Sequence, residues 1–131
     1  MSPVQRALSG AVLSFSLHDE MRIVRDELAS ERDRIARTLL KDGALRVTLV
    51  ALKPGAHLGA HRADGPILVQ VLEGSVEFHV AGSSVPLPEG SLLSLEAGLE
   101  HSVSSAAGGI FLLTVVAQAA LPPDLRQHPD E

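Results

Sequence analysis

Short apolar runs, broken by closely spaced turn signals, constrain the fold of this chain more than any other feature. From residue 35 to residue 117, β-branched and leucine-rich runs alternate with turn-forming segments such as Asp42-Gly43, Pro54-Gly55 and Gly108-Gly109. In the run from Val76 to Val80, apolar residues alternate with polar ones, as expected of a strand with one buried face. Many short strands with turns between them predict an antiparallel sandwich or barrel. Long helices do not alternate with the strands, which disfavours a parallel α/β sheet.

One amphipathic helix is predicted ahead of the strands, over residues 17–28. Leu17, Met21, Val24 and Leu28 fall on one helical stripe, and the other positions are mostly charged. Ser16, with an acidic residue three positions later, resembles a capping box at the start of the helix. We expect the apolar stripe to pack against the outside of the sheet; docking to a partner is the alternative.

These patterns divide the chain into three parts. Residues 1–34 form an N-terminal segment that carries the helix, residues 35–117 form the β-domain, and residues 118–131 form a C-terminal tail. Three prolines and several charges predict that this tail is an extended arm or is disordered.

Composition excludes several classes of function. The 131 residues suffice for one domain, and the formal net charge of -5 disfavours binding to phosphate backbones. Aromatic residues make up only 2 %, which leaves few rings on which nucleic-acid bases could stack. The chain has no cysteine, no apolar run long enough for a membrane span and no recognisable signal peptide. We therefore expect a soluble, cytoplasmic domain without nucleic-acid or membrane partners.

The first of two glycine-anchored histidine blocks runs from Gly55 to Gly74. Five residues separate Gly55 from His61, one separates His61 from Ala63, three separate Ala63 from Ile67, and six separate Ile67 from Gly74. This spacing resembles the first motif of the cupin superfamily, G-x5-H-x-H-x3or4-E-x6-G, with Ala63 and Ile67 in place of the second His and the Glu.

The second block runs from Gly90 to Ser105 and resembles the second cupin motif, G-x5-P-x-G-x2-H-x3-N. Gly98 and His101 match that motif, whereas Glu96 stands at its proline and Ser105 at its asparagine. The resemblance covers about residues 45–116 and implies an all-β fold, an antiparallel jelly-roll barrel preceded by the short N-terminal helix.

The resemblance also implies a metal chemistry that this chain carries only in part. Cupin enzymes typically hold one divalent metal inside the barrel through the two His and the Glu of the first motif and the His of the second. His61 and His101 match two of these ligands, but Ala63 and Ile67 have no lone pair to donate. Tight metal sites normally use three or more side-chain ligands. We therefore expect no resident cofactor, or a weakly bound divalent metal on His61 and His101.

Other polar residues near the motifs are weaker candidates for ligands. His57 has the strand parity of His61, but four residues of strand span about 13 Å, so it could reach the same metal only if the chain bends at Gly59. Asp64 and Gln70 have the opposite parity, and His79 is predicted to point outward.

Three roles remain open for His61 and His101: remnants satisfied by water or backbone, ligands of a weak metal site, or direct participants in ligand binding or acid–base chemistry. Together with Ala63 and Ile67 they would line an apolar pocket at the barrel mouth, with Ser102 or Arg62 at its rim.

Our leading hypothesis is a small-molecule binding or sensor-like protein without a complete metal site. The second is a metal-dependent enzyme of the dioxygenase, isomerase or decarboxylase type that uses the two histidines. The third is a structural protein whose aliphatic strands and helix serve dimerisation, with no ligand at all. The resemblance to cupins implies pairing through sheet faces or swapped terminal strands, so we expect a homodimer. Whether the chain is an enzyme, and on which ligand it acts, is left open by the sequence.

Overall fold

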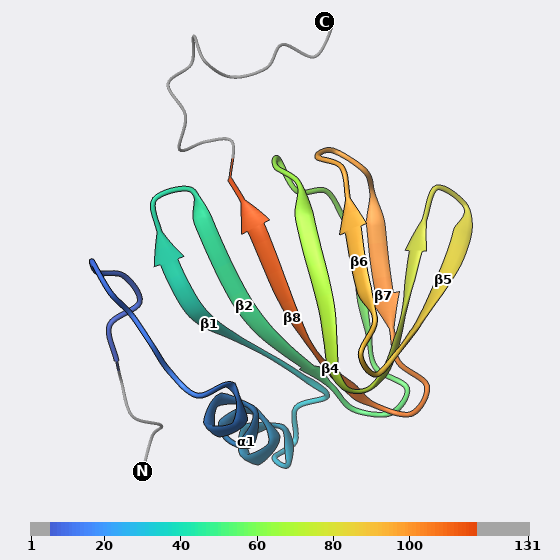
Figure 1. Cartoon of the computed structure of the whole chain (residues 1–131). Helices are drawn as coiled ribbons and strands as arrows, with labels where there is room; N and C mark the ends of the chain where they lie inside the picture. The colour runs from blue at the N-terminus through green and yellow to red at the C-terminus, as the bar shows by residue number, and fades with distance from the viewer. Residues whose placement is uncertain (1–5, 118–131) are drawn as a thin grey trace, which may run out of the picture.

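The computed structural model describes residues 6–117, which form one helix and eight strands (Figure 1). In chain order the elements are α1 (Leu17–Leu28), β1 (Arg34–Asp42), β2 (Leu45–Leu52), β3 (His57–His61), β4 (Ile67–Val80), β5 (Ser83–Pro88), β6 (Leu92–Leu95), β7 (His101–Ser104) and β8 (Gly109–Val116). The tail predicted over residues 118–131 lies outside the described residues.

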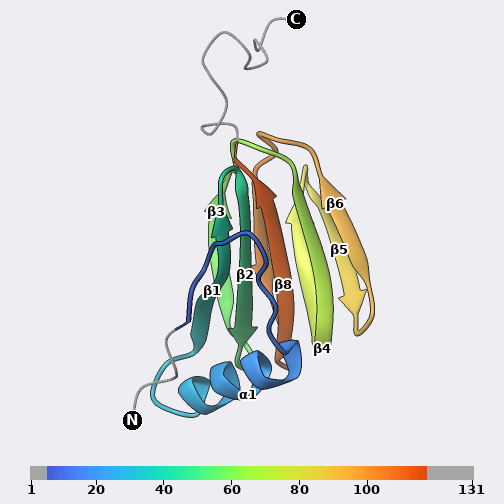
Figure 2. The same cartoon turned by 60° about the vertical axis from the view of Figure 1, so that its left-hand side comes forward.

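All strand pairs are antiparallel, and the sheet order is β1-β2-β8-β4-β7-β3, with β5 and β6 also paired to β4. The long strand β4 belongs to two sheets. Its first half pairs with β8 and β6 in a first sheet that also contains β1 and β2. Its second half pairs with β5 and β7 in a second sheet that also contains β3. The two sheets curl around one core, which confirms the predicted antiparallel jelly-roll architecture (Figures 1 and 2).

The core between the sheets is mostly aliphatic, as the composition predicts. Val69 and Val71 of β4 are almost fully buried, and Phe78 meets Phe111 edge-to-face at 5.7 Å between ring centroids. The predicted inward direction of alternate residues over Val76–Val80 is confirmed, since Val76 and Phe78 are both buried. Each such side chain contributes roughly 1.5–3 kcal/mol when it leaves water, so this layer holds the sheets together.

The helix α1 begins and ends at the predicted residues and packs on the outside of the first sheet. Val24 is fully buried among residues of β1, β2 and β8, so the packing prediction is confirmed. The Ser16 hydroxyl accepts the backbone N–H of Asp19 at 3.1 Å. The Asp19 carboxylate instead accepts Arg22 at 2.8 Å, so only the Ser16 half of the predicted capping box is formed.

Two ion pairs fasten α1 to the strands. Glu20 is only 6 % exposed and accepts Arg37 of β1 at 2.7 Å, with Arg6 at 3.5 Å. Arg25 contacts both carboxylate oxygens of Glu73 on β4, at 2.5 and 3.2 Å. This hydrogen bond from Arg25 lowers the pKa of the Glu73 carboxyl below its ordinary value.

The segment that precedes α1 covers the edge of β1, which the sequence did not reveal. Arg6 donates to the Leu39 carbonyl at 2.8 Å, and the backbone N–H of Lys41 donates to the Leu8 carbonyl at 2.9 Å. The guanidinium of Arg6 also lies 3.9 Å from the centre of the Phe15 ring. An open strand edge invites pairing with another chain, so this segment protects β1.

The four glycines of the two motifs all have positive φ, from 70° to 88°, as expected of turns. At Gly74 space adds a second constraint, because a Cβ would lie 2.2 Å from the Gly108 carbonyl oxygen. Within residues 6–117, no helix is long and apolar enough to cross a membrane.

Candidate functional site at the barrel mouth

His61 and His101 come together at one end of the second sheet. They are register partners on β3 and β7, and their ring centroids lie 4.3 Å apart at an interplanar angle of 63°. His101 is only 4 % exposed and stacks on Phe78 at 6.0 Å, whereas His61 is exposed. The two motifs therefore place their histidines in direct contact, as the resemblance implies.

A bulge in β3 decides which residues face inward with His61. Leu58 pairs with Val103 and His61 pairs with His101, so β3 carries one extra residue between these pairs. Leu58 packs against the core, whereas His57 is exposed and pairs with Ser104. The predicted shared parity of His57 and His61 is wrong, because the extra residue reverses the alternation. His57 thus has no path to the His61–His101 pair.

Both imidazoles at the mouth direct Nδ1 toward a backbone carbonyl two residues earlier. The His101 Nδ1 lies 3.1 Å from the Leu99 oxygen, and the His61 Nδ1 lies 3.4 Å from the Gly59 oxygen. A carbonyl can only accept, so in the neutral ring Nδ1 carries the proton and Nε2 keeps its lone pair. The same carbonyl contact orients metal-binding histidines in proteins. The pair therefore offers two imidazole acceptors.

The other two ligand positions of the motif belong to the core. Ile67 is 4 % exposed within the core cluster, and Ala63 packs against the same cluster. The Ala63 carbonyl accepts the backbone N–H of Gly98 at 2.8 Å, and Arg62 donates to the Gly98 carbonyl at 2.9 Å. These bonds tie the two motif loops together at the mouth.

A four-ligand metal centre does not fit these residues, because two of the four donors are replaced by hydrocarbon. No group of three or more His, Cys, Asp or Glu residues in the described part of the chain is placed to hold a metal ion. The predicted alternatives Asp64 and Gln70 are exposed. Two imidazoles, with water as the remaining ligands, are the most that this mouth supplies.

Ser105, at the asparagine position of the second motif, has a structural role. It is 2 % exposed, and its hydroxyl donates to the Ser75 carbonyl at 2.6 Å. Its backbone N–H bonds to Ala56 and its carbonyl accepts Gly55. Ser105 therefore joins the first-motif turn to β4.

The cavities near the motifs do not coincide with the predicted pocket, although one of them shares His101 with it. Three cavities in the described part of the chain measure about 510, 310 and 280 Å³. None of these three is lined by His61, Ala63 or Ile67, although His101 and Ser102 border the second. A ligand at the mouth would therefore lie on the imidazole pair rather than in one of these hollows.

His79 points outward from β4, as predicted, and its ring contacts two serine hydroxyls. Its Nδ1 lies 2.9 Å from the Ser84 hydroxyl and its Nε2 lies 3.0 Å from the Ser104 hydroxyl. Ser84 follows His79 across the β4–β5 hairpin, so the hairpin pattern contained a signal for that contact. Ser104 arrives on β7 and is brought in only by the sheet.

Comparison with known proteins gives the family. The cupin domain family model matches residues 48–116, over half of the chain. No curated protein sequence matches significantly. Among solved structures, a conserved Streptococcus pyogenes protein of unknown function is 28 % identical with a TM-score of 0.62, covering 66 % of this chain and 77 % of that one.

Two further structures show how widely the fold is shared. A cupin superfamily protein from Desulfitobacterium hafniense is 15 % identical with a TM-score of 0.64, covering 66 % of this chain and 80 % of that one. Salicylate 1,2-dioxygenase from Pseudaminobacter salicylatoxidans is 13 % identical with a TM-score of 0.72; it covers 86 % of this chain, which spans only 37 % of the dioxygenase. At these identities the likeness shows the fold alone. With the family match, the two spaced motifs and the curled antiparallel sheets, this chain belongs to the cupin domain family.

Proposed function

We propose that this protein is a small-molecule-binding, sensor-like cupin that works without a complete metal site. The observation that carries the proposal is Ile67, which stands at the carboxylate position of the motif and is 4 % exposed within the core. A buried isoleucine at that position supplies packing in place of a charge. The chain keeps the fold of the family, but two of the four metal-ligand positions of the motifs are occupied by Ala63 and Ile67.

The imidazole pair supplies the polar recognition in this proposal. His61 and His101 lie 4.3 Å apart between ring centroids, with each Nδ1 directed to a carbonyl. Their Nε2 atoms then accept hydrogen bonds from a ligand, or donate them when the rings are protonated. Phe78, which stacks on His101, gives the pair an apolar neighbour, as is common in small-molecule sites.

Metal analysis after purification without chelators tests the proposal. We expect less than stoichiometric Fe, Mn, Ni or Zn after dialysis. In a thermal-shift screen of small organic ligands, we expect hits that bind His101→Ala more weakly than the wild type. Stoichiometric metal that survives dialysis would overturn it. Hits that bind His101→Ala as tightly as the wild type would place the ligand site elsewhere.

A metal-dependent enzyme is the second candidate, and one observation favours it. Both Nδ1 atoms are held by carbonyls, which is the arrangement that presents Nε2 to a metal. A divalent ion on two imidazoles would act as a Lewis acid on a bound substrate oxygen. In that case His101→Ala loses activity and bound metal together. Activity that persists in both the apo protein and His101→Ala excludes this candidate.

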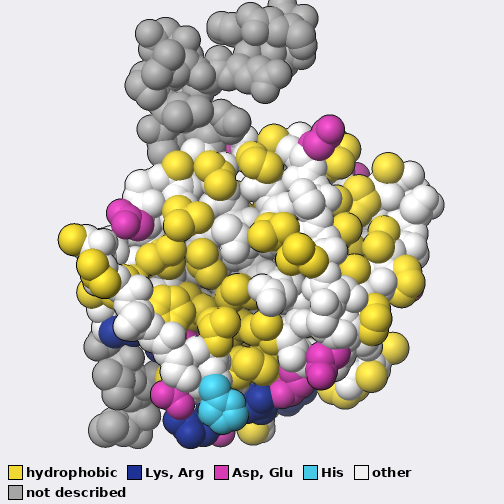
Figure 3. Space-filling view, in the orientation of Figure 1, with side chains coloured by type: hydrophobic (Ala, Val, Ile, Leu, Met, Phe, Trp, Pro, Cys, Tyr) yellow, Lys and Arg dark blue, Asp and Glu magenta, His cyan; other side chains and the backbone are white. Residues whose placement is uncertain are grey.

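We also propose a homodimer that pairs through the outer face of the first sheet. Figure 3 shows hydrophobic side chains spread over the face of the molecule that carries the helix. The exposed large apolar residues on the strands of the first sheet are Leu45, Leu68, Leu92 and Val116. Leu45 pairs with Val116 at one side of the face, and Leu68 and Leu92 lie at the other. A second copy related by a two-fold axis would place one side against the other. Light scattering should give the dimer mass, and Leu68→Glu/Leu92→Glu the monomer mass; a monomeric wild type at micromolar concentration contradicts the dimer.

We propose a cytoplasmic location, which the lack of cysteine supports, and no nucleic-acid or membrane partner, since the formal net charge of -5 disfavours both. Cell fractionation tests this location, and recovery with the membrane fraction would refute it.

A further inference from the structure

A histidine between two serine hydroxyls lies on the outer face of the second sheet, where His79 borders the cavity of about 310 Å³ that His101 also lines. The His79 ring lies 2.9 Å from Ser84 through Nδ1 and 3.0 Å from Ser104 through Nε2. A neutral imidazole has one N–H donor and one acceptor nitrogen. When Nδ1 donates to Ser84, Nε2 accepts the hydroxyl proton of Ser104. This is the arrangement of a nucleophile, its base and a group that orients the base.

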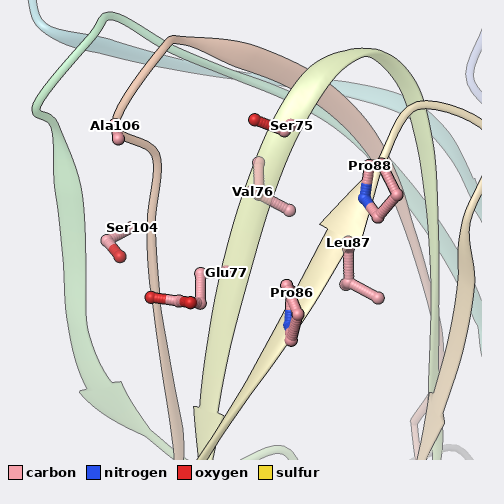
Figure 4. A pocket seen from close by; sticks show the side chains of 8 residues that line it. All are labelled: Ser75, Val76, Glu77, Pro86, Leu87, Pro88, Ser104 and Ala106. Carbon is pink, nitrogen blue, oxygen red and sulfur yellow. The ribbon is translucent and has the colours of Figure 1, made fainter.

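The surroundings of Ser104 make its oxygen accessible to a reagent. Ser104 lines the cavity of about 510 Å³, together with Glu77 and two prolines of β5, Pro86 and Pro88 (Figure 4). In Figure 4 the Glu77 side chain extends from β4 toward the strand that carries Ser104. The Glu77 carboxylate lies 4.0 Å from His79 Nε2, close enough to stabilise the imidazolium that forms when the ring takes a proton.

The charge and the apolar residues of the cavity narrow the kind of substrate. Among residues 6–117, Glu77 is the only charged residue that lines this cavity, so anionic acyl groups are repelled and neutral or cationic ones are accepted. The prolines give the cavity an apolar wall for a short hydrocarbon group. At the other serine, the β4–β5 turn holds Ala81 at a φ of 52°, a backbone conformation that costs energy and recurs at functional sites.

We propose that Ser104 is a reactive serine, activated by His79, that takes an acyl group from small neutral or cationic esters of good leaving groups. The Ser104 oxygen forms a bond to the acyl carbon while its proton moves to His79 Nε2. The bond from the acyl carbon to the leaving oxygen breaks, and that oxygen takes the proton from His79. Water then attacks the acyl-serine, with His79 again accepting and returning the proton, so that the acid is released and the hydroxyl restored.

The test is covalent labelling of the intact protein with p-nitrophenyl acetate and with a fluorophosphonate, followed by peptide mass spectrometry. We expect the label on Ser104, with the initial rate lowered about 100-fold in Ser104→Ala and in His79→Ala. Ser94→Ala is the matched control. That exposed serine lies on β6, outside the cavities that Ser104 and His79 line, and should leave the rate unchanged.

Ser84 is a positioning residue in this scheme. Ser84→Ala should lower the labelling rate about tenfold, and Ser84→Thr should restore it, whereas a purely structural role would change the melting temperature without this pattern. The proposal is overturned if folded wild-type protein takes no label, if the label lies on another residue, or if Ser104→Ala is labelled as fast as the wild type. Any of these results would mean that the hydrogen bonds of His79 serve only to join the strands.

Discussion

His101 and His79 lie on neighbouring strands of one sheet, yet the two faces give them opposite surroundings. His101 faces inward, is 4 % exposed and stacks on Phe78. His79 faces outward, has a side chain 38 % exposed, and has a serine hydroxyl at each ring nitrogen. The inner histidine keeps the motif position but has lost its carboxylate partner, whereas the outer one matches no motif and has a full set of partners. A match to a motif thus predicts the direction of a side chain, whereas its chemistry depends on the residues that contact it.

The largest expected effect on stability comes from restoring the motif residues Glu and His at positions 67 and 63. Ile67→Glu buries an unpaired carboxylate and should cost about 3–5 kcal/mol of unfolding free energy without metal. In Ala63→His/Ile67→Glu, divalent metal should return much of that stability, since a ligand that binds only the folded state stabilises it. Urea denaturation with and without Zn²⁺ measures both effects.

Ile67→Gln is the matched control for that variant, because it has a similar shape and no charge. It should lose less stability and gain no response to metal. If Ala63→His/Ile67→Glu folds but divalent metal does not raise its unfolding free energy, the side chains at positions 63 and 67 do not point toward His101.

Removing each histidine compares the two faces directly. His101→Ala leaves a hole beside Phe78 and should cost about 2–3 kcal/mol. His79→Ala removes two hydrogen bonds whose serine partners can turn to water, so about 1 kcal/mol is expected. Midpoints of urea denaturation rank the two variants. An equal or reversed ranking would mean that His79 and its two serine partners stabilise the fold more than their exposure indicates.

A substitution in the turn between β4 and β5, next to His79, should increase the stability of the protein. Ala81 has a φ of 52°, the only positive value at a non-glycine residue in the described range, and it precedes Gly82 at 78°. Asn tolerates this conformation and favours such two-residue hairpins. Ala81→Asn should therefore stabilise the protein by about 0.5–1 kcal/mol. Ala106→Asn, at a position without positive φ, should not. Thermal melting distinguishes the two, and equal shifts would refute the strain argument.

The smallest effect concerns the ion pair between α1 and β4. The lowered pKa of Glu73 means that Arg25 stabilises the fold above the ordinary carboxyl value of 4.5, and that this stabilisation is lost as the pH falls below it. Both side chains are more than a third exposed, so solvent screening limits the contribution to less than about 1 kcal/mol. Glu73→Gln should be slightly less stable than the wild type at pH 7 and equal to it near pH 3. A difference that persists at pH 3 would have another cause.

Local patterns predicted the elements that depend on neighbours in sequence. The apolar stripe and the cap at Ser16 predicted α1 at its observed residues, Leu17–Leu28, because helix periodicity and capping act within one or two turns. The glycines predicted four turns, which have positive φ in the structure, and the resemblance implied that His61 and His101 lie close together. The resemblance added the barrel itself.

What the sequence determined by itself is the order of strands and turns, since these follow from local conformational preference. The resemblance matched His61 and His101 to two positions of the family motifs. Only the tertiary structure decided the rest. The extra residue in β3 turned His57 away from the mouth, because a bulge costs little locally and is fixed by pairing with β7. Ser104 reached His79 from 25 residues away, and Arg6 reached Glu20 across the edge of β1, because contacts at such separations depend on how the sheets close around the core.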